Sequence, residues 1–119
     1  MKIILRGLPQ STNNLYRSHC RFGHPVVYMT TDGKILKESY GWQAKQQWKQ
    51  EVSGKPIEVN VELYFGDKRI HDIDNYEKIL YDSLTGICYE DDRQIWKKTV
   101  AKFYDKNNPR IEIYITESL

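Results

Sequence analysis

The chain has few cysteines, no long apolar run and no glycine-rich phosphate loop, and each absence excludes a class of protein. Its two cysteines, Cys20 and Cys88, are far apart and have no second pair nearby, so the spacing of a zinc site is missing. No segment approaches the roughly 18 consecutive apolar residues of a membrane-spanning helix. The apolar start, residues 1–7, is too short and too soon interrupted for a signal peptide. We therefore expect a cytoplasmic protein without membrane contact, and free thiols rather than a disulfide.

Length and charge set wide limits on what the chain does. Its 119 residues are the size of one domain, so we expect a single domain over residues 1–119, and 39% hydrophobic with 29% charged residues is an ordinary globular balance. The net charge of +2 alone says little about partners. Its distribution says more, because small basic clusters alternate with acidic groups at Asp72/Asp74 and at residues 90–92. This pattern is what a surface needs if it binds both a polyanion and a metal, but composition alone favours the simpler interpretation, a solvated surface of mixed charge.

Hydrophobic periodicity predicts an α+β fold. The expected elements are a strand over residues 2–8, a helix over 34–52, a strand over 57–65, a helix over 73–85, and strands over 95–104 and 110–116. Thr31 or Asp32 is suited to cap the first helix, and Gly86 to end the second. Residues 9–33 read as a long irregular loop with room for a short strand over 26–29, and residues 105–109 as a hairpin loop. The order strand-helix-strand-helix-strand-strand indicates a mixed four-stranded sheet with two helices on one face.

The stretch around residues 72–82 carries the most chemical information. In an extended chain Asp72 and Asp74 point to the same side, and along a following helix Asp74, Lys78 and Asp82 share one face. Two carboxylates with a lysine one turn away are suited to hold a hard divalent cation together with a phosphate. Phosphodiester hydrolysis needs an acidified water and compensation of charge on the leaving oxygen, which a metal and a lysine supply. A further carboxylate from Asp91 or Asp92 requires that the fold bring their loop alongside.

Each of these features also has an ordinary structural explanation. Asp72 or Asp74 is suited to cap a helix, where aspartate is favoured by hydrogen bonding and by the helix dipole. Asp74 and Lys78 have the spacing of a simple i,i+4 ion pair. Asp91 and Asp92 are also typical of a solvated turn.

The motifs together resemble the RusA family of Holliday junction resolvases. The resemblance rests on Asp72-Ile73-Asp74-Asn75 with Lys78, on Asp82-Ser83-Leu84 and Gly86, on Asp91-Asp92-Arg93-Gln94-Ile95, and on the opening Pro9-x-Ser11-x-Asn13-Asn14-x-Tyr16-Arg17. The match runs through the whole chain in order and length. One departure is Lys68-Arg69-Ile70-His71, where the family commonly has a dense arginine run. With fewer fixed positive charges, we expect weaker backbone binding and a shallower salt dependence.

The resemblance implies a function and assigns roles to residues. Asp72, Asp74 and Asp92 correspond to the magnesium-binding catalytic carboxylates of the family, with Mn²⁺ as a substitute ion, and Lys78 to its catalytic lysine. The roles of Asp82 and Asp91 stay open. Such proteins are homodimers that bind four-way DNA junctions and make paired symmetric nicks, and one chain with one site needs a two-fold partner to cut twice. The expected DNA contacts are Asn13, Asn14, Tyr16, Arg17, Lys68, Arg69 and His71.

Two other functions compete with a magnesium-dependent junction endonuclease. A non-catalytic module that binds branched DNA would keep three aspartates beside a polyanion, a repulsion that only a bound cation removes. A metal-dependent phosphohydrolase acting on a small phosphate ester has less support, because no glycine-rich phosphate loop is present and basic residues extend well beyond one pocket.

Overall fold

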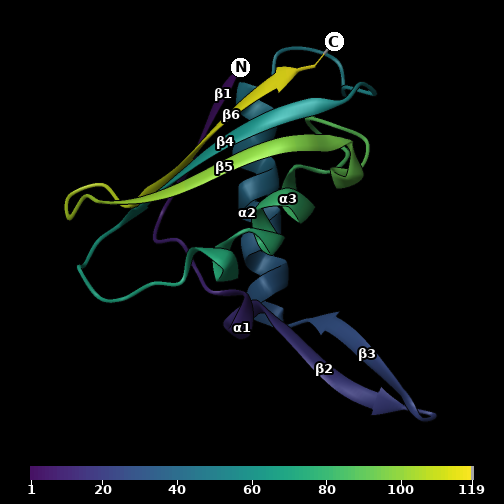
Figure 1. Cartoon of the computed structure of the whole chain (residues 1–119). Helices are drawn as coiled ribbons and strands as arrows, with labels where there is room; N and C mark the ends of the chain where they lie inside the picture. The colour runs from purple at the N-terminus through teal and green to yellow at the C-terminus, as the bar shows by residue number, and fades with distance from the viewer. Residues whose placement is uncertain (119) are drawn as a thin grey trace.

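A computed structural model describes residues 1–118 of the chain, and a four-stranded sheet forms its centre (Figure 1). The strand order is β1 (Lys2–Arg6), β6 (Arg110–Glu117), β4 (Ile57–Phe65) and β5 (Ile95–Tyr104). Strand β6 is antiparallel to both of its neighbours, whereas β4 and β5 are parallel. The mixed four-stranded sheet expected from the sequence is therefore confirmed.

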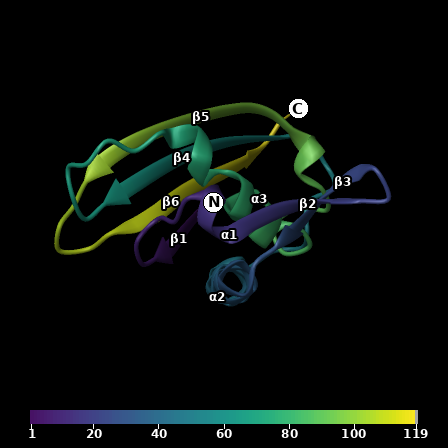
Figure 2. The same ribbon diagram turned by 90° about the horizontal axis from the view of Figure 1, so that it is seen from below.

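One face of this sheet is covered by helices and forms the core. The inward side chains of β4 are all buried, as its alternating pattern predicts: Ile57, Val59, Val61, Leu63 and Phe65. The helices α1 (Thr12–Leu15), α2 (Thr31–Gln47) and α3 (Lys78–Leu84) lie on that same side (Figure 2). From α2 and α3, Tyr40, Ala44, Leu80 and Leu84 join the core. Among residues 1–118, none of the helices combines the length and the apolar character that crossing a membrane requires.

Helix α2 begins earlier and ends earlier than the expected range of 34–52. Its N-cap is Thr30, not Thr31 or Asp32, because the Thr30 hydroxyl accepts a 3.1 Å hydrogen bond from the amide of Gly33. The helix stops at Gln47, where the Trp48 indole donates to the Glu51 carbonyl at 3.1 Å and the chain turns away. The prediction that the helix continues to residue 52 is therefore wrong.

Side chains of α2 cover the outer edge of β1. The amide of Gln47 accepts a 2.8 Å hydrogen bond from Ile4 N and donates a 2.7 Å bond to Ile4 O. One turn earlier, Gln43 accepts a 2.8 Å bond from Arg6 N. These two glutamines thus satisfy backbone groups that an edge strand otherwise leaves to water. The strand itself ends at Arg6, two residues before expected, since Gly7 has a φ of +107°.

The long irregular loop expected over residues 9–33 is instead α1 followed by a β-hairpin. Strands β2 (Tyr16–Arg21) and β3 (His24–Met29) pair only with each other, and they project away from the body of the protein (Figure 1). The two turn residues, Phe22 and Gly23, have φ of 51° and 78°, as in the tight turns that match strand twist. Both strands are largely exposed, so they lack the alternating hydrophobic pattern that reveals a half-buried strand. Only the short strand over 26–29 was anticipated.

The prediction that residues 105–109 form a hairpin loop is wrong. Strand β4 lies between β5 and β6, so the connection passes over the end of β4 instead of joining neighbours. The amide of Asp105 donates a 2.8 Å hydrogen bond to Phe65 O, the last residue of β4. At the crossing, a side chain on Gly66 would come within 3.1 Å of the Pro109 ring. The five-residue connection has a length that fits a hairpin equally well, so the sequence does not reveal that β4 lies between β5 and β6.

Candidate metal and nucleic-acid site

Asp72 and Asp74 lie where the chain enters a short 3₁₀ helix, η1 (Ile73–Tyr76). Asp72 is the N-cap of η1, and its Oδ1 accepts a 3.2 Å hydrogen bond from Asp74 N. The helix expected over 73–85 is thus divided into η1 and α3, with the break at Glu77, and Gly86 follows α3 with the expected positive φ of 86°. Both aspartates remain exposed. Asp72 therefore caps a helix and still presents its carboxylate to solvent.

Lys78 belongs to a small cluster that joins α3 to the root of the hairpin. Its ammonium lies 3.6 Å from Asp82 Oδ2 and 4.9 Å from the centre of the Tyr16 ring. The Tyr16 hydroxyl donates a 2.6 Å hydrogen bond to the same Asp82 oxygen. Burial and the neighbouring Asp82 raise the pKa of Tyr16, so the phenol keeps its proton. Asp82 thus holds both Lys78 and Tyr16, a role that the sequence left open.

Asp91 and Asp92 open a second 3₁₀ turn, η2 (Asp92–Gln94), immediately before β5. Asp91 forms a capping box with Gln94, in which Asp91 Oδ1 accepts from Arg93 N at 3.0 Å and Gln94 Oε1 accepts from Asp91 N at 2.8 Å. The Gln94 amide also donates to Ser53 O at 2.8 Å. The Asp91 side chain therefore stabilises the turn, and the neighbouring Asp92 is exposed.

A shallow pocket of about 240 Å³ brings the second acidic group together with α3. It is lined by Lys37, Asp82, Thr85, Asp91 and Asp92. The pKa of Asp92 is raised, chiefly by partial burial and then by the charges of Asp91 and Asp82, while Lys78 lowers it. Sequence reasoning missed Lys37, because its place in the fold depends on how α2 packs against α3.

The basic segment before Asp72, residues 68–71, is only partly free to contact a ligand. His71 is held within the fold: its ring stacks on Phe65 with centroids 3.9 Å apart, and its nitrogens contact Asp67 Oδ1 at 2.9 Å and the Tyr76 hydroxyl at 3.1 Å. The hydrogen bond with His71 lowers the pKa of Asp67. Lys68 and Arg69, by contrast, are exposed. Of the three expected DNA contacts here, these two present free positive charge.

Two lysines of β5 reach this segment from the edge of the sheet. Lys98 and Lys102 pair in register with Val59 and Leu63, so they lie on the helix-covered face. Lys98 Nζ contacts Glu77 Oε1 at 2.9 Å, and Lys102 Nζ donates to the carbonyl of His71 at 2.9 Å. The alternation of β5 puts them on one face, but which segment they meet depends on the tertiary fold.

The N-terminal motif packs directly onto η1. The Thr12 hydroxyl donates a 2.7 Å hydrogen bond to the carbonyl of Asn75, and Asn13 and Asn14 on the same turn are exposed. Arg17 donates to the carbonyl of Asn13. The fold therefore places the opening motif and the Asp72–Asn75 motif next to each other, although more than 50 residues separate them in sequence.

Comparison with known proteins identifies the relatives of this chain. Residues 7–116 match the family model described as endodeoxyribonuclease RusA. The chain belongs to the RusA family. It is 26% identical over 110 residues to the crossover junction endodeoxyribonuclease RusA of Escherichia coli strain K12, and the aligned region covers 92% of this chain and 88% of that protein. The crossover junction endodeoxyribonuclease of Enterobacteria phage 82 is similar over the same shares of both chains, also at 26% identity. A shorter match links 39% of this chain to 32% of YqaN from Bacillus subtilis, at 44% identity over 46 residues.

The acidic residues of this RusA family member have the donor chemistry of a magnesium site. Asp72, Asp74 and Asp92 are exposed carboxylates. The pKa of Asp92 is raised first by partial burial and then by the charges of Asp91 and Asp82, and a bound cation would offset both causes. Mg²⁺ commonly takes only one or two protein carboxylates and keeps several waters. Within residues 1–118, no three acidic, histidine or cysteine side chains converge closely enough to form a complete metal cage. The assignment of Asp72, Asp74 and Asp92 as ligands stays a prediction.

Proposed function

We propose that the protein is a structure-selective endodeoxyribonuclease that cuts Holliday junctions and related branched DNA. Membership of the RusA family over residues 7–116 carries this proposal. The Escherichia coli and phage 82 relatives are both named crossover junction endodeoxyribonucleases. The exposed Asp72, Asp74 and Asp92, the Lys78 ammonium held by Asp82, and the β5 lysines that reach Glu77 and His71 support hydrolysis of a polyanionic backbone.

We further propose that Asp72, Asp74 and Asp92 hold Mg²⁺, for which Mn²⁺ can substitute. When bound, the ion supplies an acidified water and compensates charge on the phosphate oxygens. Lys78 adds a positive charge at the developing negative oxygen, in the manner of preorganised electrostatic catalysis. Asp82 and Tyr16 position Lys78 by holding its ammonium between a carboxylate and an aromatic ring. Their role is therefore positioning, and they need not touch the DNA.

The β2–β3 hairpin supports the DNA-binding part of this function. The first 31 residues of the chain contain no aspartate or glutamate, so the whole hairpin carries only neutral or positive side chains. Arg17 and Arg21 are four residues apart on β2, so their side chains lie on the same face of this exposed strand, where they can contact phosphates. At the tip, Phe22 is 90% exposed and adopts the left-handed conformation that L side chains rarely tolerate. An exposed aromatic ring next to Arg21 is suited to stack on an unpaired base at a branch point.

The proposed activity also requires a second copy of the chain. A four-way junction is resolved by two related cuts, and one chain carries one set of candidate catalytic residues. A two-fold homodimer supplies two sites in the symmetry that the junction itself has. We therefore propose that the active form is a homodimer.

The central test uses Asp74→Asn with a synthetic four-way junction. We expect the variant to fold and to bind the junction as tightly as the parent or more tightly, because one negative charge near the DNA is removed. Cleavage in Mg²⁺ should fall by at least about a hundredfold, as expected when a group that stabilises the transition state is lost. Binding is measured by gel shift in EDTA, and cleavage by denaturing gel with Mg²⁺ or Mn²⁺.

Glu51→Gln is the matched control, because it makes the same carboxylate-to-amide change at an exposed position in the turn after α2. It should cleave as the parent does. Full cleavage by Asp74→Asn would refute the catalytic assignment. A parent protein that binds junctions tightly but never nicks them in either metal would identify a non-catalytic branched-DNA module instead.

A further inference from the structure

The shallow acidic pocket beside α3 contains a lysine that the proposed function does not use. Lys37 of α2 lines this pocket of about 240 Å³ together with Asp82, Asp91 and Asp92. Lys34, which lies one turn earlier on the same helix, does not line it. Lys37 therefore brings positive charge to the candidate site from a helix that carries none of the residues proposed above for catalysis or DNA binding.

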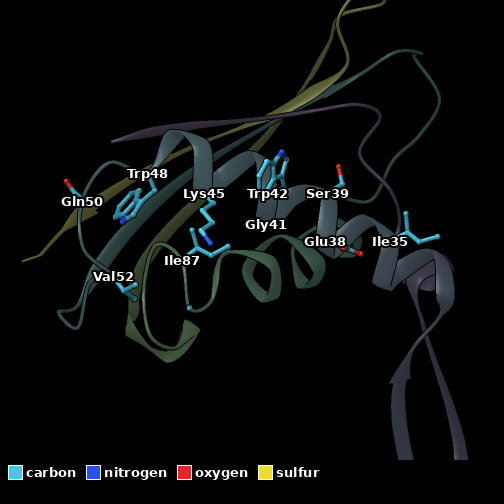
Figure 3. A pocket seen from close by; sticks show the side chains of 11 residues that line it. Ile35, Glu38, Ser39, Gly41, Trp42, Lys45, Trp48, Gln50, Val52 and Ile87 are labelled. Carbon is cyan, nitrogen blue, oxygen red and sulfur yellow. The ribbon is translucent and has the colours of Figure 1, made fainter.

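The packing of α2 determines which way Lys37 faces. Residues four apart lie on the same face of a helix, so Lys37 shares a face with Gly33 and Gly41. At Gly33 this face lies directly against the backbone of Leu15, with no room for a side chain. At Gly41 it lies against the turn after α3, where an added methyl group would be 3.4 Å from Ile87 Cδ1 (Figure 3). Lys37 lies between these two contacts and is therefore on the side of α2 that faces α3 and its pocket.

The Lys37 ammonium is available to a ligand, whereas two of its acidic neighbours are engaged within the chain. None of the salt bridges among residues 1–118 includes Lys37, and its side chain is exposed. Asp82 Oδ2, by contrast, accepts a hydrogen bond from the Tyr16 hydroxyl and lies 3.6 Å from the Lys78 ammonium. Asp91 caps the η2 turn. A lysine that served only to neutralise this pocket would pair with one of its carboxylates, so the unpaired Lys37 favours a partner from outside the chain.

We propose that Lys37 is a phosphate-binding residue of the candidate site and contacts one phosphodiester of the DNA strand that enters it. The aspartates of the pocket repel that phosphate, and a positive charge within the same pocket offsets the repulsion. Lys78 is shared with Asp82 and Tyr16, so it neutralises only part of this negative charge. An exposed ammonium binds phosphate as a point charge and needs no strict geometry. The inference rests on the proposed function, which brings DNA to these aspartates, and adds the residue of α2 that holds the strand.

A double-mutant cycle between protein and DNA tests this contact directly. A set of synthetic four-way junctions carries one methylphosphonate each, at a different position near the branch, which replaces a charged phosphate by a neutral group. Binding to the full chain is measured by gel shift in EDTA. On the unmodified junction, Lys37→Gln should weaken binding about fivefold at about 0.1 M salt and reduce the slope of log K against log salt by about one. At the contacted position the variant and the parent should bind equally, because the charge that Lys37 contacts is already absent.

Two further variants control for general electrostatics and for folding. Lys34→Gln removes the same charge one turn earlier on α2, and its small effect should be the same on every junction. Lys37→Arg keeps the charge and should bind as the parent does. Both positions are exposed, so circular dichroism should show native folding of all three variants.

The inference is refuted if Lys37→Gln binds the unmodified junction as tightly as the parent does. It is also refuted if the variant loses the same affinity on every junction of the set, since Lys37 then adds only to the general charge of the surface. A position-dependent effect of the same size from Lys34→Gln would refute it as well. Binding is measured without metal, so a parent whose Lys37 couples to one phosphate but which never cuts a junction would contradict only the proposed nuclease function.

Discussion

The hydroxyl of Tyr16 donates a 2.6 Å hydrogen bond to Asp82, which ties the first residue of the projecting hairpin to the helix that carries Lys78. The same Asp82 oxygen lies 3.6 Å from the Lys78 ammonium. A single carboxylate thus links the proposed DNA-binding arm with the proposed catalytic lysine. Any shift of the hairpin root changes the surroundings of that lysine.

This link predicts the behaviour of Tyr16→Phe. Loss of one hydrogen bond to an ionised, partly exposed carboxylate should lower the free energy of unfolding by about 1 kcal/mol. Because Lys78 loses part of its support, cleavage at saturating junction should fall by up to about a hundredfold, while the junction Kd stays unchanged. Urea unfolding and single-turnover cleavage measure the two effects. Tyr28→Phe, at a half-exposed position on the same hairpin, should change neither, and equal loss of binding and cleavage would contradict the positioning role.

The hairpin tip predicts a distinction between branched and linear DNA. Phe22→Ala should weaken binding to a four-way junction by about tenfold, within the range expected for losing one stacked base, and leave binding to linear duplex unchanged. Arg21→Gln should weaken both, and should reduce the slope of log K against log salt by about one. Lys106→Gln removes the same charge from the opposite loop and serves as control. Equal effects of Phe22→Ala on junction and duplex would show that the ring does not recognise a branch.

The sheet face away from the helices predicts a pH dependence of stability. Glu112 is buried between Lys2 and Arg110, at 2.6 Å from each, and hydrogen bonds from these two groups lower its pKa. A carboxyl group with a lowered pKa in the folded state stabilises the fold above its ordinary pKa near 4.5, and this contribution is lost as the pH falls through the lowered value.

Glu112→Gln should accordingly lower the free energy of unfolding at pH 7 by about 1.5–3 kcal/mol, the range for a hydrogen-bonded charged group. The difference between variant and parent should shrink steadily as the pH is lowered below 4.5. Urea titrations at a series of pH values measure it. A difference that is the same at pH 7 and at pH 3 would show that shape, not charge, stabilises this site.

Two glycines of α2 predict opposite effects of the same substitution. A methyl group on Gly33 would lie 2.4 Å from the backbone oxygen of Leu15, so Gly33→Ala should force α2 away from the hairpin root and cost about 1–3 kcal/mol. At Gly41 the nearest atom, Ile87 Cδ1, is 3.4 Å away, so Gly41→Ala should fit and stabilise the helix by up to about 1 kcal/mol. Urea unfolding compares them, and equal losses would contradict the close contact at Gly33.

The sequence predicts those parts of the fold in which one face is buried. The alternation of β4 is confirmed, because burial imposes a period on the side chains. The apolar stripe that the four-residue spacing predicts on the first long helix, Leu36, Tyr40, Ala44, Trp48 and Val52, is confirmed as far as Trp48, whereas Val52 lies beyond α2 and is exposed. The sequence does not predict the β2–β3 hairpin, because both of its faces are exposed and no alternation of apolar and polar residues marks its strands. The β5–β6 connection was misjudged because the residues of a five-residue loop do not reveal whether the flanking strands are neighbours.

The sequence likewise identifies some residues of the candidate site but not the contacts around them. Asp72, Asp74 and Lys78 could be proposed from their types and local spacing, whereas the choice of Asp92 came from the resemblance to the family. Their surroundings could not: the Tyr16–Asp82 bond spans 66 residues, and Lys98 reaches Glu77 from another element. Contacts of this length depend on which faces of the helices meet the sheet.

The two edges of the sheet are protected by different means. At β1 the side-chain amide of Gln47 bonds both backbone groups of Ile4, so an incoming strand would find its hydrogen-bonding positions already taken. At β5 the lysines at positions 97, 98 and 102 lie along the edge strand, and lysines on an edge disfavour its pairing with the same strand of another molecule. Concentrated protein should therefore resist fibril-like stacking through the edges of its sheet.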